Sequence, residues 1–310
     1  MTRLAKKTLK ARSGSNRPRK GFSVGRGLAW AYVAVIVIVT VFPFYWILRT
    51  SLSNNFALAT HAGSVLPVDL TLGPYKRALG LASAADARAE GGSGASLSIP
   101  LYLRNSLIYA GSLTVLSVFF STIAAYAFAR LRWRGRNLVF TVFLSALMIP
   151  GILTLLPNFV LIKQLSLLNS FAGLVLPEAL FSAFGIFFLR QFMLALNAEV
   201  EEAAIIDGAS RLRILFQITA PMSSGPIVTL AILTFIRTWN DYFWPLMVTT
   251  GDTVKPLTLA LAVFKQSSPQ SMPDWAGLMA ATLIAALPML VIFMIFGRRI
   301  VNSIGFTGIR

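Results

Sequence analysis

Long uninterrupted apolar runs constrain this chain more than any other feature of its sequence. A helix needs roughly 20 apolar residues to cross the hydrocarbon core of a bilayer. We expect six transmembrane helices, at residues 28–48, 106–129, 137–162, 171–188, 226–248 and 275–297. Only 13% of the residues are charged, whereas a soluble domain carries about 25%. The sequence therefore predicts an all-α integral membrane protein that crosses the bilayer six times.

Three prolines fall within the third and fourth of these runs: Pro150, Pro157 and Pro177. Proline is tolerated in spanning helices when neighbouring groups satisfy the freed carbonyls. These two spans are therefore the ones whose regularity is least certain from the sequence.

The distribution of positive charge predicts the orientation. The net charge is +17, and Lys and Arg concentrate in residues 3–26, 130–136, 190–213 and 298–310. With six crossings, all of these segments lie on one side, and cytoplasmic loops retain an excess of Lys and Arg. We expect both termini to be cytoplasmic, in a bacterial or archaeal plasma (inner) membrane. The outer segments carry fewer positive charges.

The spans divide the chain into segments. We expect a basic cytoplasmic tail at 1–27, a first span at 28–49, an extracytoplasmic loop at 50–105, a five-helix core at 106–297 and a cytoplasmic tail at 298–310. Within the outer loop, residues 82–96 are small, polar and rich in glycine, which predicts a flexible loop tip. The basic tail is interpreted as an arm that fixes orientation and touches acidic headgroups, with nucleic-acid binding as the alternative.

The inner segment 194–225 has the pattern of two short helices. Asn197 is expected to cap the first helix, and carboxylates in its first turns complement the positive end of the helix dipole: Glu199, Glu201 and Glu202. Gly208 is expected to end it in a left-handed conformation. Ser210 is expected to cap a second helix at 211–218, which Pro221 ends.

Apolar residues are too frequent in this segment for a solvated loop: Ile205, Ile206, Leu212, Leu215 and Phe216. An apolar face on a short helix pair can dock into a groove of a partner protein. The alternative is that these residues pack under the spans of the same chain, and spacing alone does not decide between the two.

The same segment carries a motif. Glu202-Ala203-Ala204, then Gly208, then Ile218-Thr219-Ala220-Pro221 resembles the EAA loop of binding-protein-dependent ABC importers, apart from Ala220, where leucine is usual. Further runs resemble the sugar permeases of that family: Ala125–Leu131 with Gly135, Phe187–Phe192, Trp239-Asn240-Asp241, Trp244-Pro245-Leu246 and Gly305–Arg310. The last is similar to the tail of MalG-type subunits.

The resemblance implies a type I importer permease fold in which the EAA helix pair couples the spans to a separate ATPase. It assigns the coupling role to Glu202, Ala203, Ala204, Asp207 and Gly208. The implied partners are a second permease in a heterodimer, two copies of a cytoplasmic ATPase that binds ATP and Mg, an extracytoplasmic solute-binding protein and the lipid bilayer. The implied cargo is a sugar, such as a di- or oligosaccharide.

Catalysis by this chain itself is not expected. The sequence contains no phosphate-binding loop of the G-x-x-x-x-G-K-[ST] type, no cysteine and a single histidine, His61. We therefore predict a non-catalytic subunit with no cofactor and no metal site.

Charged residues within spans are expensive and mark functional sites by default. Arg237 and Asp241 are four residues apart, so we expect them to share a helix face, on which they could pair. They are interpreted either as structural, facing a partner, or as part of the translocation path with Trp239 and Asn240. Glu178 is expected in the outer half of its span, either reaching the headgroups or lining an outer vestibule.

Three other functions remain open from the sequence. The cargo of a permease of the same family can be glycerol phosphate or another polyol derivative. An ion-coupled secondary transporter is a different class, although neither paired halves nor a carboxylate cluster is present. The interpretation as a membrane-anchored DNA-binding protein is based only on the charge of the N-terminal tail. We predict no nucleic-acid partner.

Overall fold

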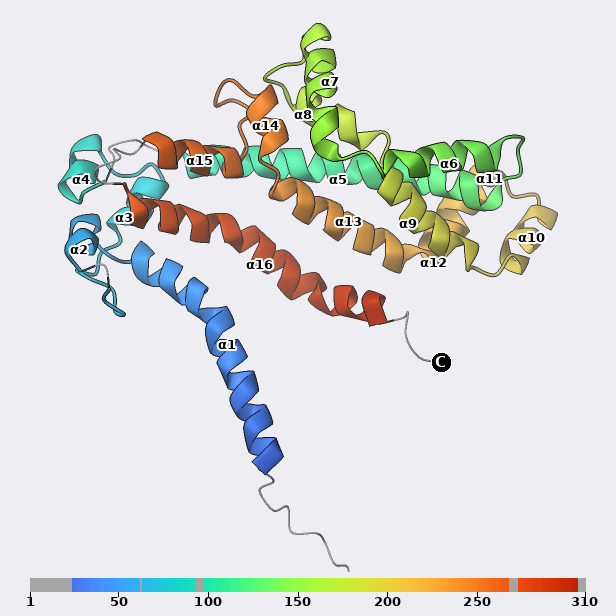
Figure 1. Cartoon of the computed structure of the whole chain (residues 1–310). Coiled ribbons are helices and arrows are strands. Elements are labelled where there is room, and N and C mark those ends of the chain that lie inside the picture. The colour runs from blue at the N-terminus through green and yellow to red at the C-terminus, as the bar shows by residue number, and fades with distance from the viewer. Residues whose placement is uncertain (1–23, 62, 93–96, 268–272, 306–310) are drawn as a thin grey trace, which may run out of the picture. The chain divides into compact units, whose positions relative to one another are not determined.

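Helices make up the regular structure of the chain (Figure 1). The computed structural model describes residues 24–61, 63–92, 97–267 and 273–305, and their only strand-like pairing is one isolated bridge between Ser53 and Leu70. The chain divides into two compact units, Met1–Trp46 and Ile47–Arg310. The first contains most of α1 (Val24–Ser51), an apolar helix with Pro43 inside it.

Three short helices precede the core in the second unit: α2 (Asn55–Thr60), α3 (Gly73–Ala78) and α4 (Ala84–Ala89). The side chain of Asn54 caps α2, and that of Ser83 caps α4 by accepting a hydrogen bond from the amide of Asp86. The prediction of an unstructured tip at 82–96 was therefore wrong for Ala84–Ala89, because a serine cap nucleates a helix there. Residues 93–96 lie outside the described residues.

Helix α5 (Ile99–Arg130) is the central element of the second unit. It begins seven residues before the predicted span at 106–129, and it contributes buried side chains to all four apolar clusters of the described core. It packs on α8, α9 and α13. The contact with α9 is close: a Cβ added to Gly185 would lie 2.5 Å from the Oγ of Ser121. Small residues at such contacts let membrane helices approach closely.

The third and fourth predicted spans are each broken. The third consists of α6 (Arg136–Ala146) and α7 (Gly151–Gln164), which meet at 99°, and the fourth of α8 (Phe171–Ala179) and α9 (Ala183–Leu194), which meet at 45°. Pro150 occupies the N-cap position of α7, where its missing amide proton costs no helical hydrogen bond. The two spans whose regularity the prolines put in question, at 137–162 and 171–188, are thus each bent between two helices.

The fifth span also ends early. Helix α13 (Ser224–Trp239) stops before Asn240, and a separate short helix, α14 (Phe243–Val248), follows it. The sequence prediction of one helix over 226–248 missed this break. It also missed α15 (Leu257–Ser267), whereas α16 (Trp275–Gly305) includes the whole predicted sixth span.

Between α9 and α13 lies the predicted helix pair. The first helix is α10 (Glu199–Ile206), and the second is α11 (Arg211–Ile214), which continues through a π-helical turn, η1 (Leu215–Thr219), into α12 (Ala220–Met222). The N-cap residue of α10 is Ala198, one position after the predicted Asn197, whose side chain accepts from the amide of Glu199. Pro221 does not end the second helix; it sits in the first turn of α12.

By length and composition, three helices of the described residues can each cross a bilayer: α1, α5 and α16. Up to six spans result when each bent pair counts as one, namely α6 with α7, α8 with α9, and the α11–α12 segment with α13. The fold is therefore that of a multi-pass helical membrane protein.

Candidate functional site

The helix pair presents most of its motif outward. Glu202, Ala203, Asp207 and Gly208 are exposed, whereas Ala204 is half-buried against the cluster formed by the ends of α5, α9 and α13. Gly208 has a φ of +78°, as predicted for the residue that ends α10, and a Cβ placed on it would meet no atom within 4 Å. The glycine is therefore required by backbone conformation and not by lack of space.

Apolar side chains surround this motif on the same helix pair. Ile206 is 86% exposed and Leu212 is 65% exposed, and Ile205 and Phe216 are exposed as well. We call these four residues, with Glu202 and Gly208, the coupling surface. Leu215 differs, because it is buried in the core. The five residues therefore differ: Leu215 packs inside the chain, and Phe216 is exposed although its ring stacks on Phe119 of α5. Ile205, Ile206 and Leu212 are exposed.

One glutamate beside the motif points the other way. Glu201 is buried, and its carboxylate lies 3.0 Å from Nε of Arg130 at the end of α5. The sequence placed Glu201 in the first turn of α10, where it complements the helix dipole, but indicated no partner for it. The spacing of 71 residues between the two charges offers no local signal of their pairing.

A second polar cluster lies among the spans. Arg237 on α13 forms an ion pair with Glu178 on α8, with 2.5 Å between Nη2 and Oε2. The hydroxyl of Tyr109 on α5 donates to Asp241 at 2.8 Å. The shared helix face that the spacing of Arg237 and Asp241 suggested is absent, because α13 ends at Trp239 and Asp241 no longer continues the helix.

The two members of the ion pair are accessible, with 61% of the Arg237 side chain and 38% of the Glu178 side chain exposed. Asn240 is exposed too. Trp239, in contrast, is 4% exposed and stacks on Phe235 within the core. Of the residues predicted for the translocation path, Trp239 is thus a packing residue in this structure.

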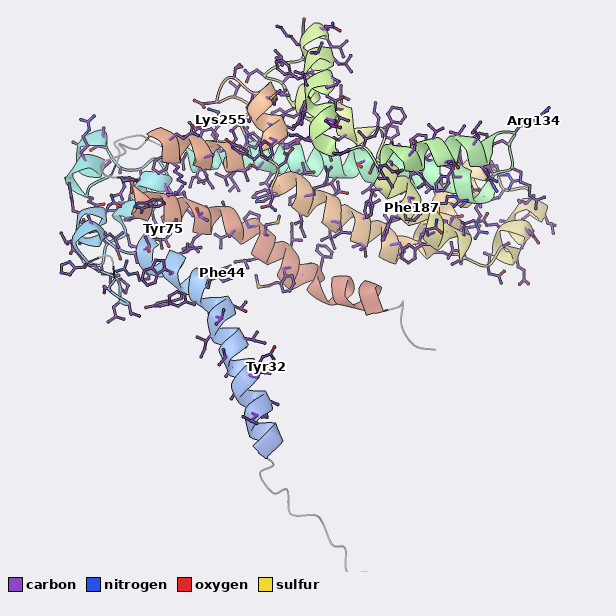
Figure 2. The ribbon with its side chains drawn as sticks, viewed as in Figure 1. Tyr32, Phe44, Tyr75, Arg134, Phe187 and Lys255 are labelled. Atoms are coloured by element: carbon purple, nitrogen blue, oxygen red, sulfur yellow. The ribbon has the colours of Figure 1, made fainter. Side chains whose placement is uncertain are left out.

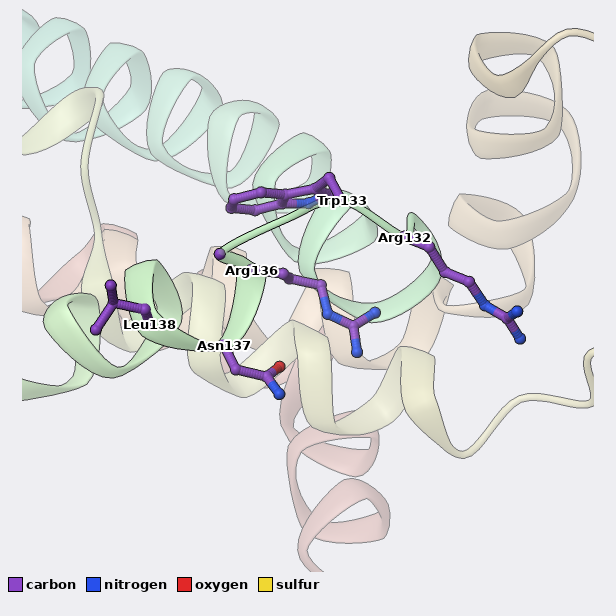
Figure 3. A pocket seen from close by; sticks show the side chains of 6 residues that line it. Arg132, Trp133, Arg136, Asn137 and Leu138 are labelled. Carbon is purple, nitrogen blue, oxygen red and sulfur yellow. The ribbon is translucent and has the colours of Figure 1, made fainter.

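A cationic pocket occupies the turn between α5 and α6. Figure 3 shows this pocket, of about 380 Å³, which is lined by Arg132, Trp133, Gly135, Arg136, Asn137 and Leu138. The guanidinium of Arg136 donates to the carbonyl of Leu131, and no carboxylate is among the lining residues. Figure 2 shows Arg134, in the same turn, and Tyr75 on α3 at opposite ends of the second unit. No group of three metal-binding side chains occurs in the described part of the chain.

Comparison with known proteins identifies the architecture. The family model for binding-protein-dependent transport system inner membrane components matches residues 117–305. The chain belongs to this family. It is thus a membrane-spanning permease component of a transport system that uses a binding protein.

Named relatives of this permease cover most of its length. The diacetylchitobiose uptake system permease protein NgcG of Streptomyces coelicolor is 31% identical over 95% of this chain and 91% of its own. The trehalose/maltose transport system permease protein MalG of Thermococcus litoralis is 30% identical over 87% and 91%. The glycerol-3-phosphate permease protein UgpE of Shigella flexneri is 35% identical over 65% and 71%.

A solved structure matches the fold. It is that of a bacterial ABC transporter involved in the import of the acidic polysaccharide alginate, with a TM-score of 0.75, 21% identity, and coverage of 89% of this permease and 96% of that chain. The expected importer permease fold is confirmed by this likeness and by the family match.

Proposed function

We propose that this permease and a second, different permease chain together form the translocation path of an ATP-driven importer for di- or oligosaccharides. The coupling surface carries this proposal, since it exposes Ile206 and Leu212 beside charged residues on a short helix pair. An amphipathic helix of this kind buries its apolar residues in a groove of a partner. The partner that fits is a cytoplasmic ATPase in two copies, which holds ATP and Mg.

The mechanism follows from linkage between the two chains. An ATPase whose nucleotide states bind the helix pair differently shifts the permease between inward-open and outward-open conformations. Glu202, Ala203, Ala204, Asp207 and Gly208 provide the contact in this proposal. The permease performs no chemistry of its own and binds no cofactor.

The polar cluster of Glu178, Arg237 and Asp241 favours a sugar over a negatively charged cargo. Arg237 is the cation best placed to attract a phosphate, but Glu178 neutralises it at 2.5 Å, and Asp241 adds a further carboxylate nearby in the chain. Such a surface offers hydrogen-bond donors and acceptors to hydroxyl groups without a net positive charge. We propose that Glu178, Arg237, Asn240 and Asp241 line the path. Glycerol phosphate, the cargo named for UgpE, is the second candidate.

Uptake by the assembled complex tests the proposal. Proteoliposomes containing the permease, its companion permease and the ATPase are supplied with binding protein and radiolabelled disaccharide outside and with ATP inside. We expect accumulation that requires ATP. Accumulation of glycerol phosphate alone would select the second candidate, and uptake driven by a proton or sodium gradient without ATP would overturn the proposal.

The Arg237–Glu178 pair yields a separate prediction. Replacing Glu178 with glutamine leaves Arg237 as an uncompensated cation in the membrane, which is expensive, and we expect uptake to fall about tenfold. The double variant with Arg237→Gln and Glu178→Gln should retain more uptake than Glu178→Gln alone. Asp252→Asn, which removes the exposed carboxylate of the pair with Lys255, is the control. Equal uptake in the single and double variants would contradict the pairing.

The orientation is also part of the proposal. With both termini cytoplasmic, the α5–α6 turn faces the inner leaflet, where its pocket of Arg132 and Arg136 meets anionic headgroups. The solute-binding protein then docks on the side of α2 to α4. The natural chain has no cysteine, so single cysteines report sidedness without background.

We expect a cysteine at Leu81, which is 74% exposed, to react with a membrane-impermeant maleimide in intact cells. A cysteine at Arg134 should react only in inside-out vesicles. The measurement is labelling of each variant in both preparations, with a cysteine-free chain as the blank. Labelling of the Arg134 variant from outside would reverse the orientation.

A further inference from the structure

The buried carboxylate of Glu201 connects three helical elements. Its Oε1 lies 3.0 Å from Nε of Arg130, the last residue of α5, and accepts a hydrogen bond of 3.2 Å from the hydroxyl of Thr219 in η1. Nη2 of Arg130 donates to the carbonyl of Leu196 at 2.7 Å. Arg130, at the end of α5, thereby contacts both Leu196, just after α9, and Glu201, in the first turn of α10.

The burial of this group makes the arrangement specific. The side chains of Arg130 and Glu201 are 11% and 9% exposed. Burying an ion pair costs desolvation that its attraction only partly offsets, so an apolar pair would stabilise the fold as well. What an apolar pair cannot provide is a fixed geometry, since the hydrogen bonds to Glu201 and from Arg130 form only within a narrow range of distances and angles. The other carboxylates of α10, on Glu199 and Glu202, are exposed.

Helix α5 extends this connection into the membrane. The same helix carries Arg130 at one end and, 21 residues earlier, Tyr109, whose hydroxyl donates to Asp241. At about 1.5 Å per residue, the two side chains are about 30 Å apart along one continuous helix. A displacement of α10 that moves Arg130 along the axis therefore also moves Tyr109.

We propose that the ion pair between Arg130 and Glu201, supported by Thr219, is the joint through which the coupling helix pair moves α5. Glu201 is a positioning residue in this role, distinct from the motif residue Glu202, which faces the partner. The proposal rests on the proposed function, because it assumes that an ATPase displaces the helix pair. In this proposal, the movement of the helix pair is transmitted to one span, α5, and from its residue Tyr109 to Asp241.

The test uses the assembled complex in proteoliposomes and the ratio of sugar molecules imported per ATP hydrolysed. For Glu201→Gln, which keeps size and one acceptor oxygen but loses the charge, we expect hydrolysis to continue while this ratio falls at least about fivefold. Glu199→Gln removes the same charge two residues away from an exposed position, and its ratio should equal that of the natural chain. The charge swap of Arg130→Glu with Glu201→Arg should recover part of the ratio.

Each outcome bears on the joint. An unchanged number of sugar molecules imported per ATP in Glu201→Gln would overturn the joint. This holds also if that variant has a lower unfolding temperature and yield, because a purely structural pair would lower stability without changing the ratio. A swap whose ratio is no higher than that of Arg130→Glu alone or of Glu201→Arg alone would also overturn it. The natural chain and Glu199→Gln report on the proposed function separately: absence of ATP-dependent uptake in both would overturn the function and the joint together.

Discussion

Replacing Gly208 with valine is expected to abolish ATP-dependent uptake while the protein remains inserted in the membrane. Gly208 adopts a φ of +78°, and a β-branched residue in this left-handed region costs about 1–3 kcal/mol of strain. The turn between α10 and α11 then relaxes to another conformation, and the coupling surface loses its shape. Uptake and binding-protein-stimulated ATP hydrolysis, measured on the same proteoliposomes, check the result.

Gly225→Val is the matched control for this experiment. A Cβ at Gly225 also meets no atom within 4 Å, and the backbone there lies outside the left-handed region. We expect this variant to retain uptake. Normal stimulated hydrolysis in Gly208→Val would show that the turn does not couple the two chains.

The largest loss of stability is expected at the start of α16. Arg77 on α3 is 3% exposed, and its guanidinium forms two hydrogen bonds with the carboxylate of Asp274, at 3.0 and 3.1 Å. Asp274→Asn keeps an acceptor for the amide of Gly277 but leaves Arg77 with only the partly exposed Glu90. Breaking a buried pair on one side costs about 3–5 kcal/mol. Because Glu90 remains, we expect a decrease of about 3 kcal/mol in the free energy of unfolding, measured by denaturant titration in detergent.

The pair of Asp252 with Lys255 provides the comparison. The Lys255 side chain is 15% exposed, but the Asp252 side chain is 62% exposed, so water solvates its carboxylate, and a pair solvated in this way contributes about 0–1 kcal/mol. Asp252→Asn should therefore leave the unfolding free energy almost unchanged. If Asp274→Asn and Asp252→Asn lost the same amount of unfolding free energy, the burial of Arg77 would not be what makes its pair with Asp274 stabilising.

The elements predicted best from the sequence are those specified by local signals. The runs that became α5 and α16 are apolar over a full span, and the turn at Gly208 follows from a glycine after a helical pattern. Ser210 caps α11 as expected, accepting a hydrogen bond from the amide of Arg213. In each case, residues within a few positions of one another determine the outcome.

Other features depend on residues far apart in the chain. Glu178 and Arg237 are separated by 59 positions, and a pattern of i and i+4 charges gave a false local solution with Asp241. The break after Trp239 has no proline or glycine to mark it, unlike the break at Pro150. Apolar composition predicts that a segment enters the membrane but does not show where its axis turns.

The same limit applies to the candidate site. The motif around Glu202 predicted where the proposed contact with the ATPase lies, and Glu202 and Gly208 are exposed there. The burial of Glu201 could not be predicted, because two adjacent glutamates look alike in sequence. Only the position of α5 relative to α10 separates one that binds Arg130 from one that faces outward.

The pairing of Arg237 with Glu178 has a consequence for the electrical properties of the transporter. Moving one elementary charge across a membrane potential of 100 mV changes its energy by about 2.3 kcal/mol. The two side chains are held together at 2.5 Å, so a conformational change that shifts them along the membrane normal moves no net charge. The pair of Arg237 with Glu178 therefore adds no voltage dependence to such a movement, in contrast to a lone charge at the same place.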